Sequence, residues 1–202
     1  MKGRRWLLLT AVLLVACSNG TTSAGTPPSA QEILAMPYKA NVKDAHFTLT
    51  AHIVSGSISF DATGEGLIVI KPQQASHFTM TTTISGQNLR WEVIIVNGRE
   101  YDLSPDNPRW ILEDTVGRSN PSSFKGTDAM LAGEETMPLG KAWHVTAKDA
   151  TGRPIEAWVR ESDGFPLKYV NRGDQGSNFS ATFDRFNTGQ SISPPPASDI
   201  QA

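Results

Sequence analysis

The sequence predicts a mainly β protein of the α+β class, built on one antiparallel sheet of about ten strands. Between residues 46 and 184, apolar and polar residues alternate with a period of two in one stretch after another, as in half-buried strands. Tight-turn dipeptides separate these stretches, and Asn97-Gly98 is the strongest of them. Strands that follow one another through tight turns pair antiparallel.

The N-terminus has the pattern of an exported protein. Lys2, Arg4 and Arg5 precede an apolar run at residues 6–16, which is too short to cross a bilayer as a helix. The run ends in "LVAC", and Cys17 is the only cysteine of the chain. This end resembles the lipobox of bacterial lipoproteins, in which the cysteine sulfur carries diacylglycerol and the chain is cut before it. The alternative is an incidental cysteine near an ordinary cleavage site.

These features divide the chain into four parts. Residues 1–16 are predicted to be a lipoprotein signal peptide, and residues 17–29 the lipidated Cys17 with a flexible, uncharged tether rich in Ser, Thr, Gly and Pro. Residues 30–193 form one domain, and residues 194–202 are predicted to be a disordered tail. The expected location is extracytoplasmic, lipid-anchored to the cell membrane in a bacterial envelope. A single cysteine excludes an intrachain disulfide.

Charge argues against nucleic acid as a partner. The formal net charge of the whole chain is −2. Removal of residues 1–16 leaves 15 basic and 20 acidic residues, with no basic run. Such a surface suits neither nucleic acid nor an anionic lipid surface bound through charge alone.

A short helix is expected before the first strand. Ser29 and Glu32 have the spacing of a capping box, and apolar residues follow them. Further along, Gly64 and Gly66 suggest a bulge in the second strand. Residues 114–141 lack clean alternation, so they are expected to be irregular, with a short helix at best within 127–135.

The apolar positions of the predicted strands share one face of the sheet. These candidate cavity-lining residues are Phe47, Leu49, Ile53, Phe60, Phe78, Met80, Trp91, Val93, Ile95, Val145, Val159, Phe179 and Phe183. Only one short helix and one irregular segment are available to cover them. The face therefore either lines a groove that binds a hydrophobic ligand or belongs to an ordinary filled core.

Two segments carry a resemblance to a known family. They are "GEETMPLGKAWHV", at residues 133–145, and "WVRESDGFPLK", at residues 158–168. With the order of elements over residues 29–193, they resemble the LppX/LprG-type lipoproteins and, more distantly, the LolA-like carriers. The resemblance implies a curved antiparallel half-barrel with short helices on its concave side. It also implies a hollow that takes up acyl chains, and a role in carrying lipid rather than in catalysis.

No catalytic, metal or cofactor signature stands out. The motifs G-x-S-x-G, H-E-x-x-H and the Walker loop are missing from the sequence. His46 and His52 share a strand face but lie about 20 Å apart at strand rise, too far to share one metal ion. We therefore expect no enzyme and no cofactor, but a lipoprotein that binds lipid acyl chains. The alternative is a surface-displayed sensor or interaction module with a filled core and an envelope protein as partner. A hydrolase is a third, weaker interpretation.

Overall fold

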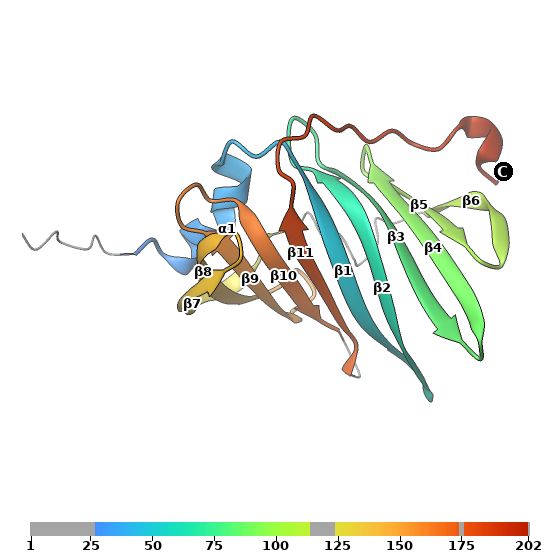
Figure 1. The fold of residues 1–202 in the computed structure, drawn as a ribbon, viewed down its shortest axis with the longest axis horizontal. Coiled ribbons are helices and arrows are strands. Elements are labelled where there is room, and N and C mark those ends of the chain that lie inside the picture. Colours follow the sequence, from blue (N-terminus) through green and yellow to red (C-terminus); the bar gives the residue numbers. More distant parts are fainter. Residues whose placement is uncertain (1–26, 114–123, 174–175, 202) are drawn as a thin grey trace, which may run out of the picture.

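A computed structural model describes residues 27–113, 124–173 and 176–201 (Figure 1). Its strands form one open sheet of 11 strands, in the order β6-β5-β4-β3-β2-β1-β11-β10-β9-β8-β7, and all neighbours pair antiparallel. The predicted class, a mainly β fold with a curved half-barrel sheet, is confirmed.

The elements have the following bounds. They are α1 (Ala30–Lys39), β1 (Asp44–Ser55), β2 (Ile58–Val69), β3 (Ala75–Ile84), β4 (Gln87–Val96), β5 (Arg99–Ser104), β6 (Asn107–Glu113), β7 (Thr127–Met137), β8 (Gly140–Lys148), β9 (Pro154–Arg160), β10 (Pro166–Arg172), β11 (Asn178–Asp184) and the 3-10 turn η2 (Ala197–Asp199).

Helix α1 begins at the predicted capping box. Ser29 accepts a hydrogen bond from the backbone of Glu32, and the Glu32 carboxylate accepts one from the backbone of Ser29. The helix then buries Ile33 and Leu34 against the sheet face that carries Phe47 and Phe183. We call this the helix face, and the opposite one the outer face.

The central strands follow the predicted alternation. Phe47 and Leu49 of β1 are buried on the helix face, whereas Thr48 and Thr50 between them are exposed on the outer face. In the turn from β4 to β5, Asn97 and Gly98 have φ values of 56° and 71°. Both positions of a type I′ turn need such positive values.

Gly64 and Gly66 do not form the expected bulge. The register of β2 with β1 and with β3 is continuous through both residues. A Cβ at Gly64 would overlap the carbonyl oxygen of Thr79, and one at Gly66 would lie 2.7 Å from Cζ of Phe47. The glycines therefore allow a close approach of backbone and of the Phe47 ring.

Residues 127–137 form the edge strand β7, so the expectation of irregular structure or a short helix is wrong there. Residues 124–126 are irregular, as expected, and residues 138–141 form the turn to β8 and its start. Residues 114–123 lie outside the described residues. Strand β7 pairs with β8 through two register shifts, and most of its residues are exposed on both faces. These features remove the alternation by which a strand is recognised in sequence.

The C-terminal segment also differs from expectation. Up to Gln201 it runs along the strand ends from β11 to β6 instead of forming a disordered tail (Figure 1). The buried carboxylate of Asp44 accepts hydrogen bonds from Thr188 and Gly189. Ile192 and Ile200 then cover an apolar cluster on β2–β5 of the outer face. These contacts join residues far apart in sequence, which a composition rich in Pro and Ser does not reveal.

The Gly64→Ala substitution tests the close approach of β2 and β3. Because the added methyl meets backbone, we expect a loss of about 3 kcal/mol or more in the free energy of unfolding, measured by urea denaturation. The matched control is Gly56→Ala in the β1–β2 turn, where φ is 61° and the space is open. That variant should lose only about 1 kcal/mol. Equal losses in the two variants would contradict this account.

Candidate ligand site on the helix face

The sheet register brings the predicted lining residues into continuous rows. One row pairs Phe183, Phe47, Gly66, Phe78 and Val93 across β11, β1, β2, β3 and β4. Cross-strand partners of this kind share a face. The whole predicted set thus lies on the helix face, although its members come from seven strands spread over the sequence.

Part of this face is already covered by the protein itself. Helix α1 and Phe124 pack over strands β1, β11, β10 and β9, which are neighbours in the sheet. The ring of Phe124 lies 5.7 Å from that of Phe183. Phe47 contacts Phe183 and Phe78 at ring distances of 5.9 and 6.1 Å. The predicted residues buried in this cluster are Phe47, Leu49, Phe78, Val145, Val159 and Phe183, and Ile95 of β4 is buried outside it. Their packing is that of a filled core.

The other predicted residues remain partly exposed. We call them the open patch, and they are Ile53, Phe60, Met80, Trp91, Val93 and Phe179. Phe60 and Trp91 stack with their ring centroids 6.3 Å apart and an interplanar angle of 12°. Helix α1 packs on β7, β8 and β9, at the other end of the sheet. Met80, Val93 and Phe179 contact the edge of the core cluster, so the patch is only partly covered. The sequence-predicted set therefore divides into a sealed half and an open half.

Asp102 of β5 lies at the margin of the open patch. It pairs with Val93 in register, so its carboxyl lies on the helix face. Its Oδ1 atom is buried and has no hydrogen-bond partner. Burial, together with the charges of Glu100 and Glu113, raises the pKa of the Asp102 carboxyl from 3.8 to about 6.

The histidines lie on the outer face and pair with carboxylates across strands. His46 lies 2.6 Å from Asp184, and His77 lies 2.7 Å from Glu92. Alternation places them on the polar face but does not reveal their partners. Among the residues that the structure describes, no group of three or more His, Cys, Asp or Glu side chains could hold a metal ion.

The β8–β9 region carries another contact that the sequence did not show. His144 lies between Glu135 and Glu156, at 2.9 and 3.0 Å, and its ring stacks on Trp158 at 4.1 Å. Glu135 thus has an ion-pair partner across the strands β7 and β8. Trp158 belongs to the outer face, which explains why it is out of phase with Val159.

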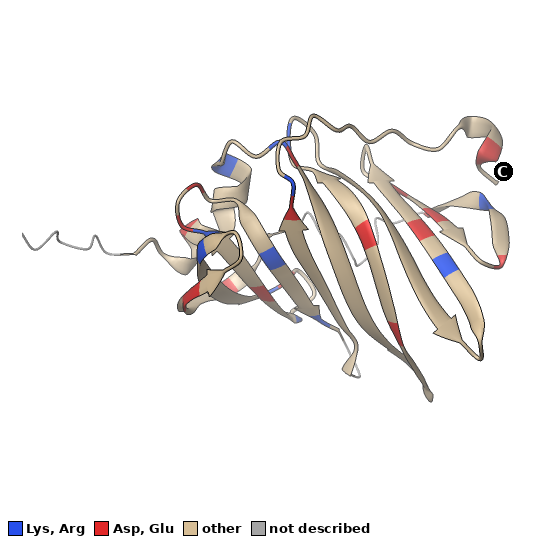
Figure 2. Ribbon diagram, viewed as in Figure 1, with Lys and Arg blue, Asp and Glu red and all other residues tan. Residues whose placement is uncertain are grey.

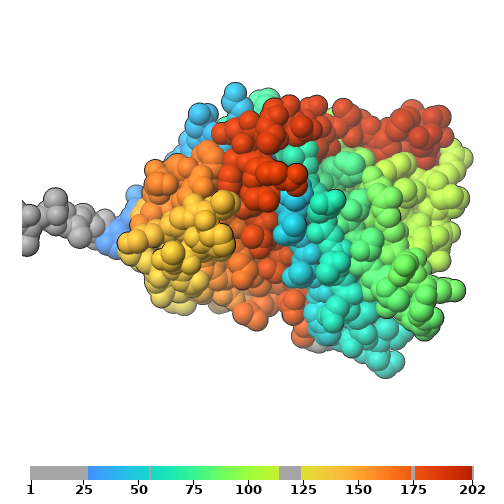
Figure 3. Space-filling model, in the orientation of Figure 1, coloured from blue at the N-terminus to red at the C-terminus, as the bar shows by residue number. Residues whose placement is uncertain are grey.

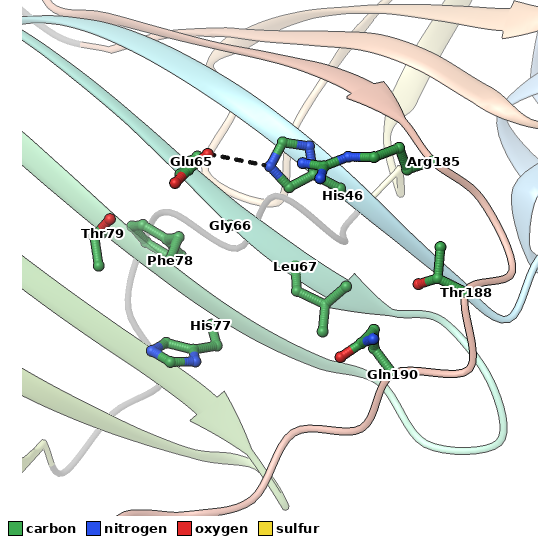
Figure 4. A pocket seen from close by; sticks show the side chains of 10 residues that line it. All are labelled: His46, Glu65, Gly66, Leu67, His77, Phe78, Thr79, Arg185, Thr188 and Gln190. Atoms are coloured by element: carbon green, nitrogen blue, oxygen red, sulfur yellow. Dashed lines mark ion pairs between the residues drawn. The ribbon is translucent and has the colours of Figure 1, made fainter.

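The outer face also has a cavity of about 470 Å³ beneath the C-terminal segment, lined by both polar and apolar side chains. In Figure 4 the ion pair of His46 and Glu65, 3.5 Å apart, faces Thr188 and Gln190. Lys and Arg are scattered singly over the sheet, with Asp and Glu among them (Figure 2). Glu65 and Arg185 line this cavity, and such charged groups suit an acyl chain less well than the open patch does.

Several solved structures are similar to the chain. An uncharacterized conserved protein from Thermus thermophilus is 14% identical, with a TM-score of 0.51 over 85% of this chain and 98% of its own. LprF from Mycobacterium bovis is 15% identical, with a TM-score of 0.47 over 82% and 96%. A LolA superfamily protein from Nitrosomonas europaea is 9% identical, with a TM-score of 0.36 over 85% and 97%. No protein-family model and no curated protein matches the chain.

These similarities concern the fold. The structure from Thermus thermophilus shares the fold, and the curved antiparallel half-barrel that the sequence resemblance implied is confirmed. In the part of the chain that the structure describes, no helix is both long enough and apolar enough to span a membrane. Cys17 lies outside the described residues, so its lipidation stays a prediction.

The raised pKa of Asp102 predicts a pH dependence of stability. The folded protein keeps the Asp102 proton up to a higher pH than the unfolded chain does, so stability falls as the pH rises from about 4 to about 6. Asp102→Asn should remove this fall. At pH 7 it should raise the free energy of unfolding by up to about 1 kcal/mol, after allowance for solvent screening of a half-exposed group.

Urea denaturation of both proteins at pH 4, 5, 6 and 7 checks this expectation. The two proteins should be equally stable at pH 4 and diverge as the pH rises. Asp106→Asn, at an exposed position in the β5–β6 turn, serves as the control. If the difference in the free energy of unfolding between Asp102→Asn and the original protein stays constant from pH 4 to pH 7, titration of Asp102 is not the cause.

Proposed function

We propose that the protein is a membrane-anchored, extracytoplasmic lipoprotein that binds or carries a hydrophobic ligand, such as lipid acyl chains, on its helix face. The observation that carries the proposal is the open patch. Six large apolar side chains on β1–β4 and β11 share one face of a curved sheet and stay partly exposed, while the same face is sealed near α1. Concave, mostly apolar surfaces with few polar groups are typical ligand sites.

Desolvation supplies the binding energy in this mechanism. Burial of apolar surface contributes about 25 cal/mol per Å², so an acyl chain that buries a few hundred Å² gains several kcal/mol. The stacked rings of Phe60 and Trp91 offer a flat apolar surface to such a chain. Asp102 lies opposite Val93 of the patch in register, and its protonation removes a charge from the edge of the site.

The anchor belongs to the same proposal. The lipobox-like end at Cys17 and the uncharged tether that follows it support attachment of the domain to a membrane through two acyl chains. A lipid-bound protein held in this way remains beside the source of its ligand. We propose no catalytic step, and a screen for turnover of generic esters should show none.

A second candidate is a surface-displayed protein-interaction or sensor module without a lipid ligand. It is favoured by one observation, namely that α1 and Phe124 already give the helix face a filled core over its sealed half. An envelope protein would then be the partner. Absence of any bound lipid, together with capture of a defined envelope protein, would favour this candidate.

Two substitutions on neighbouring residues of β3 test the ligand site. Met80→Trp adds a large side chain to the open patch, whereas Thr81→Trp adds the same side chain to the outer face. We expect uptake of a C16 fatty acid, counted by native mass spectrometry, to fall about tenfold or more in Met80→Trp because the added ring fills the site. Thr81→Trp should bind as the original protein does. The proposal fails if the original protein, free of detergent, takes up no fatty acid.

A further inference from the structure

The edge strand β7 exposes an uncharged, apolar segment. Residues 129–133, with the sequence AMLAG, contain no charged side chain and no proline. The side chain of Met130 is 66% exposed and that of Leu131 is 38% exposed. Leu139, in the turn to β8, is 43% exposed. Soluble proteins usually protect an edge strand with charge, proline or a cover, so this segment is a candidate contact surface.

Exposed apolar side chains gather at this edge more than elsewhere. The described residues include five large hydrophobic side chains in the exposed class, and three of them belong to the β7–β8 hairpin. The other two, Ile58 and Leu112, lie at the tip of the β1–β2 hairpin and on the opposite edge strand β6. They provide natural controls because they are similarly exposed at 59% and 41%.

The start of the folded domain lies beside this edge. In the first turn of α1, Gln31 donates a hydrogen bond from Nε2 to the carbonyl oxygen of Gly126, just before β7, at 3.2 Å. Figure 3 shows the first described residues, in blue, against the hairpin of β7 and β8, in yellow. The tether therefore enters the domain at the β7 edge.

Tether length limits which surface meets the bilayer. Twelve residues separate Cys17 from Ser29. A flexible segment of that length spans roughly 20 Å on average and about 40 Å at full extension. The far edge strand β6 is ten strand spacings away from β7, which is about 48 Å along the sheet. A lipid anchor at Cys17 thus holds the β7 edge at the headgroups far more often than the β6 edge.

We propose that the β7 edge, through Met130, Leu131 and Leu139, rests on the lipid surface to which Cys17 is anchored. This inference rests on the anchoring part of the proposed function. Apolar side chains that reach the headgroup region gain free energy by burial, which adds to the acyl anchor.

The charges around the strand are compatible with this contact. Asp128 pairs with Lys148 at 2.9 Å, and Glu135 pairs with His144 at 2.9 Å. Two of the acids of β7 are therefore balanced by their own sheet, which limits repulsion from anionic headgroups. The exposed Lys125 precedes the strand. The contact should consequently depend little on salt.

The test uses the full lipidated chain in phosphatidylcholine vesicles. Because the sulfur of Cys17 is blocked by lipid in this account, Met130→Cys provides the only free thiol for an environment-sensitive fluorophore. Ile58→Cys and Leu112→Cys are labelled in the same way as matched controls. A nitroxide lipid near the headgroups should quench the fluorophore at position 130 at least about fivefold more than at position 58 or 112.

Each other result overturns the inference. If the vesicle-bound protein shows equal quenching at the three positions, or none at position 130, β7 does not contact lipid. A fluorescence change at position 130 that depends on protein concentration without vesicles would assign the edge to a second copy of the chain. Two results would show that the anchor is absent: the protein does not float with vesicles, or the original chain takes up label at Cys17. Without the anchor, the proposed contact of β7 with lipid is also excluded. Fatty-acid uptake, measured on the same sample, separates that failure from failure of the ligand site.

Discussion

Within the residues that the structure describes, one short helix faces an eleven-stranded sheet that it cannot cover, and the rest of the structure depends on this mismatch. Helix α1 has ten residues and is about 15 Å long, whereas the sheet is about 48 Å wide. Placed over β7–β9, with Phe124 beside it, the helix seals only part of the apolar face. The large side chains on β1–β4 are left partly exposed, and a hydrophobic guest is the simplest way to cover them.

Glycines in the centre of the sheet make this geometry possible. At Gly66 the missing side chain leaves room for the ring of Phe47, so the aromatic row continues from β11 to β3. At Gly64 the backbones of β2 and β3 come close together. On the outer face the C-terminal segment covers a second apolar cluster, and cross-strand pairs of histidine and carboxylate occupy much of the rest. The apolar residues in the sealed half of the helix face are thus covered by α1 and Phe124, and those of the outer face by the C-terminal segment.

Local patterns predicted most of the fold. The capping box at Ser29, the period of two in β1 and the Asn97-Gly98 turn all depend on neighbouring residues, and each is confirmed. The alternation also placed every candidate lining residue on one face of the sheet, as the register shows. Sequence could not separate the sealed half of that face from the open half, because the position of α1 is a tertiary property.

Where the sequence-based predictions were wrong, the structure depends on contacts between residues that are distant in the sequence or on a pattern that the sequence lacks. Strand β7 is exposed on both faces and shifts register twice, so it has no alternation to detect. The C-terminal segment is held by distant partners, such as Asp44, and by two isoleucines that cover the outer-face cluster. The pair Gly64 and Gly66 shows that glycine in a strand can serve close packing as well as a bulge.

Photo-crosslinking with a fatty acid that carries a diazirine near the end of its chain would test the central claim most directly. Peptide mapping of the irradiated protein identifies which part of the helix face touches the ligand. The account predicts adducts on peptides that contain Phe60, Met80 or Trp91, and their loss when unlabelled fatty acid competes. Adducts confined to the sealed strands β8 and β9, or labelling that does not respond to competition, would contradict it.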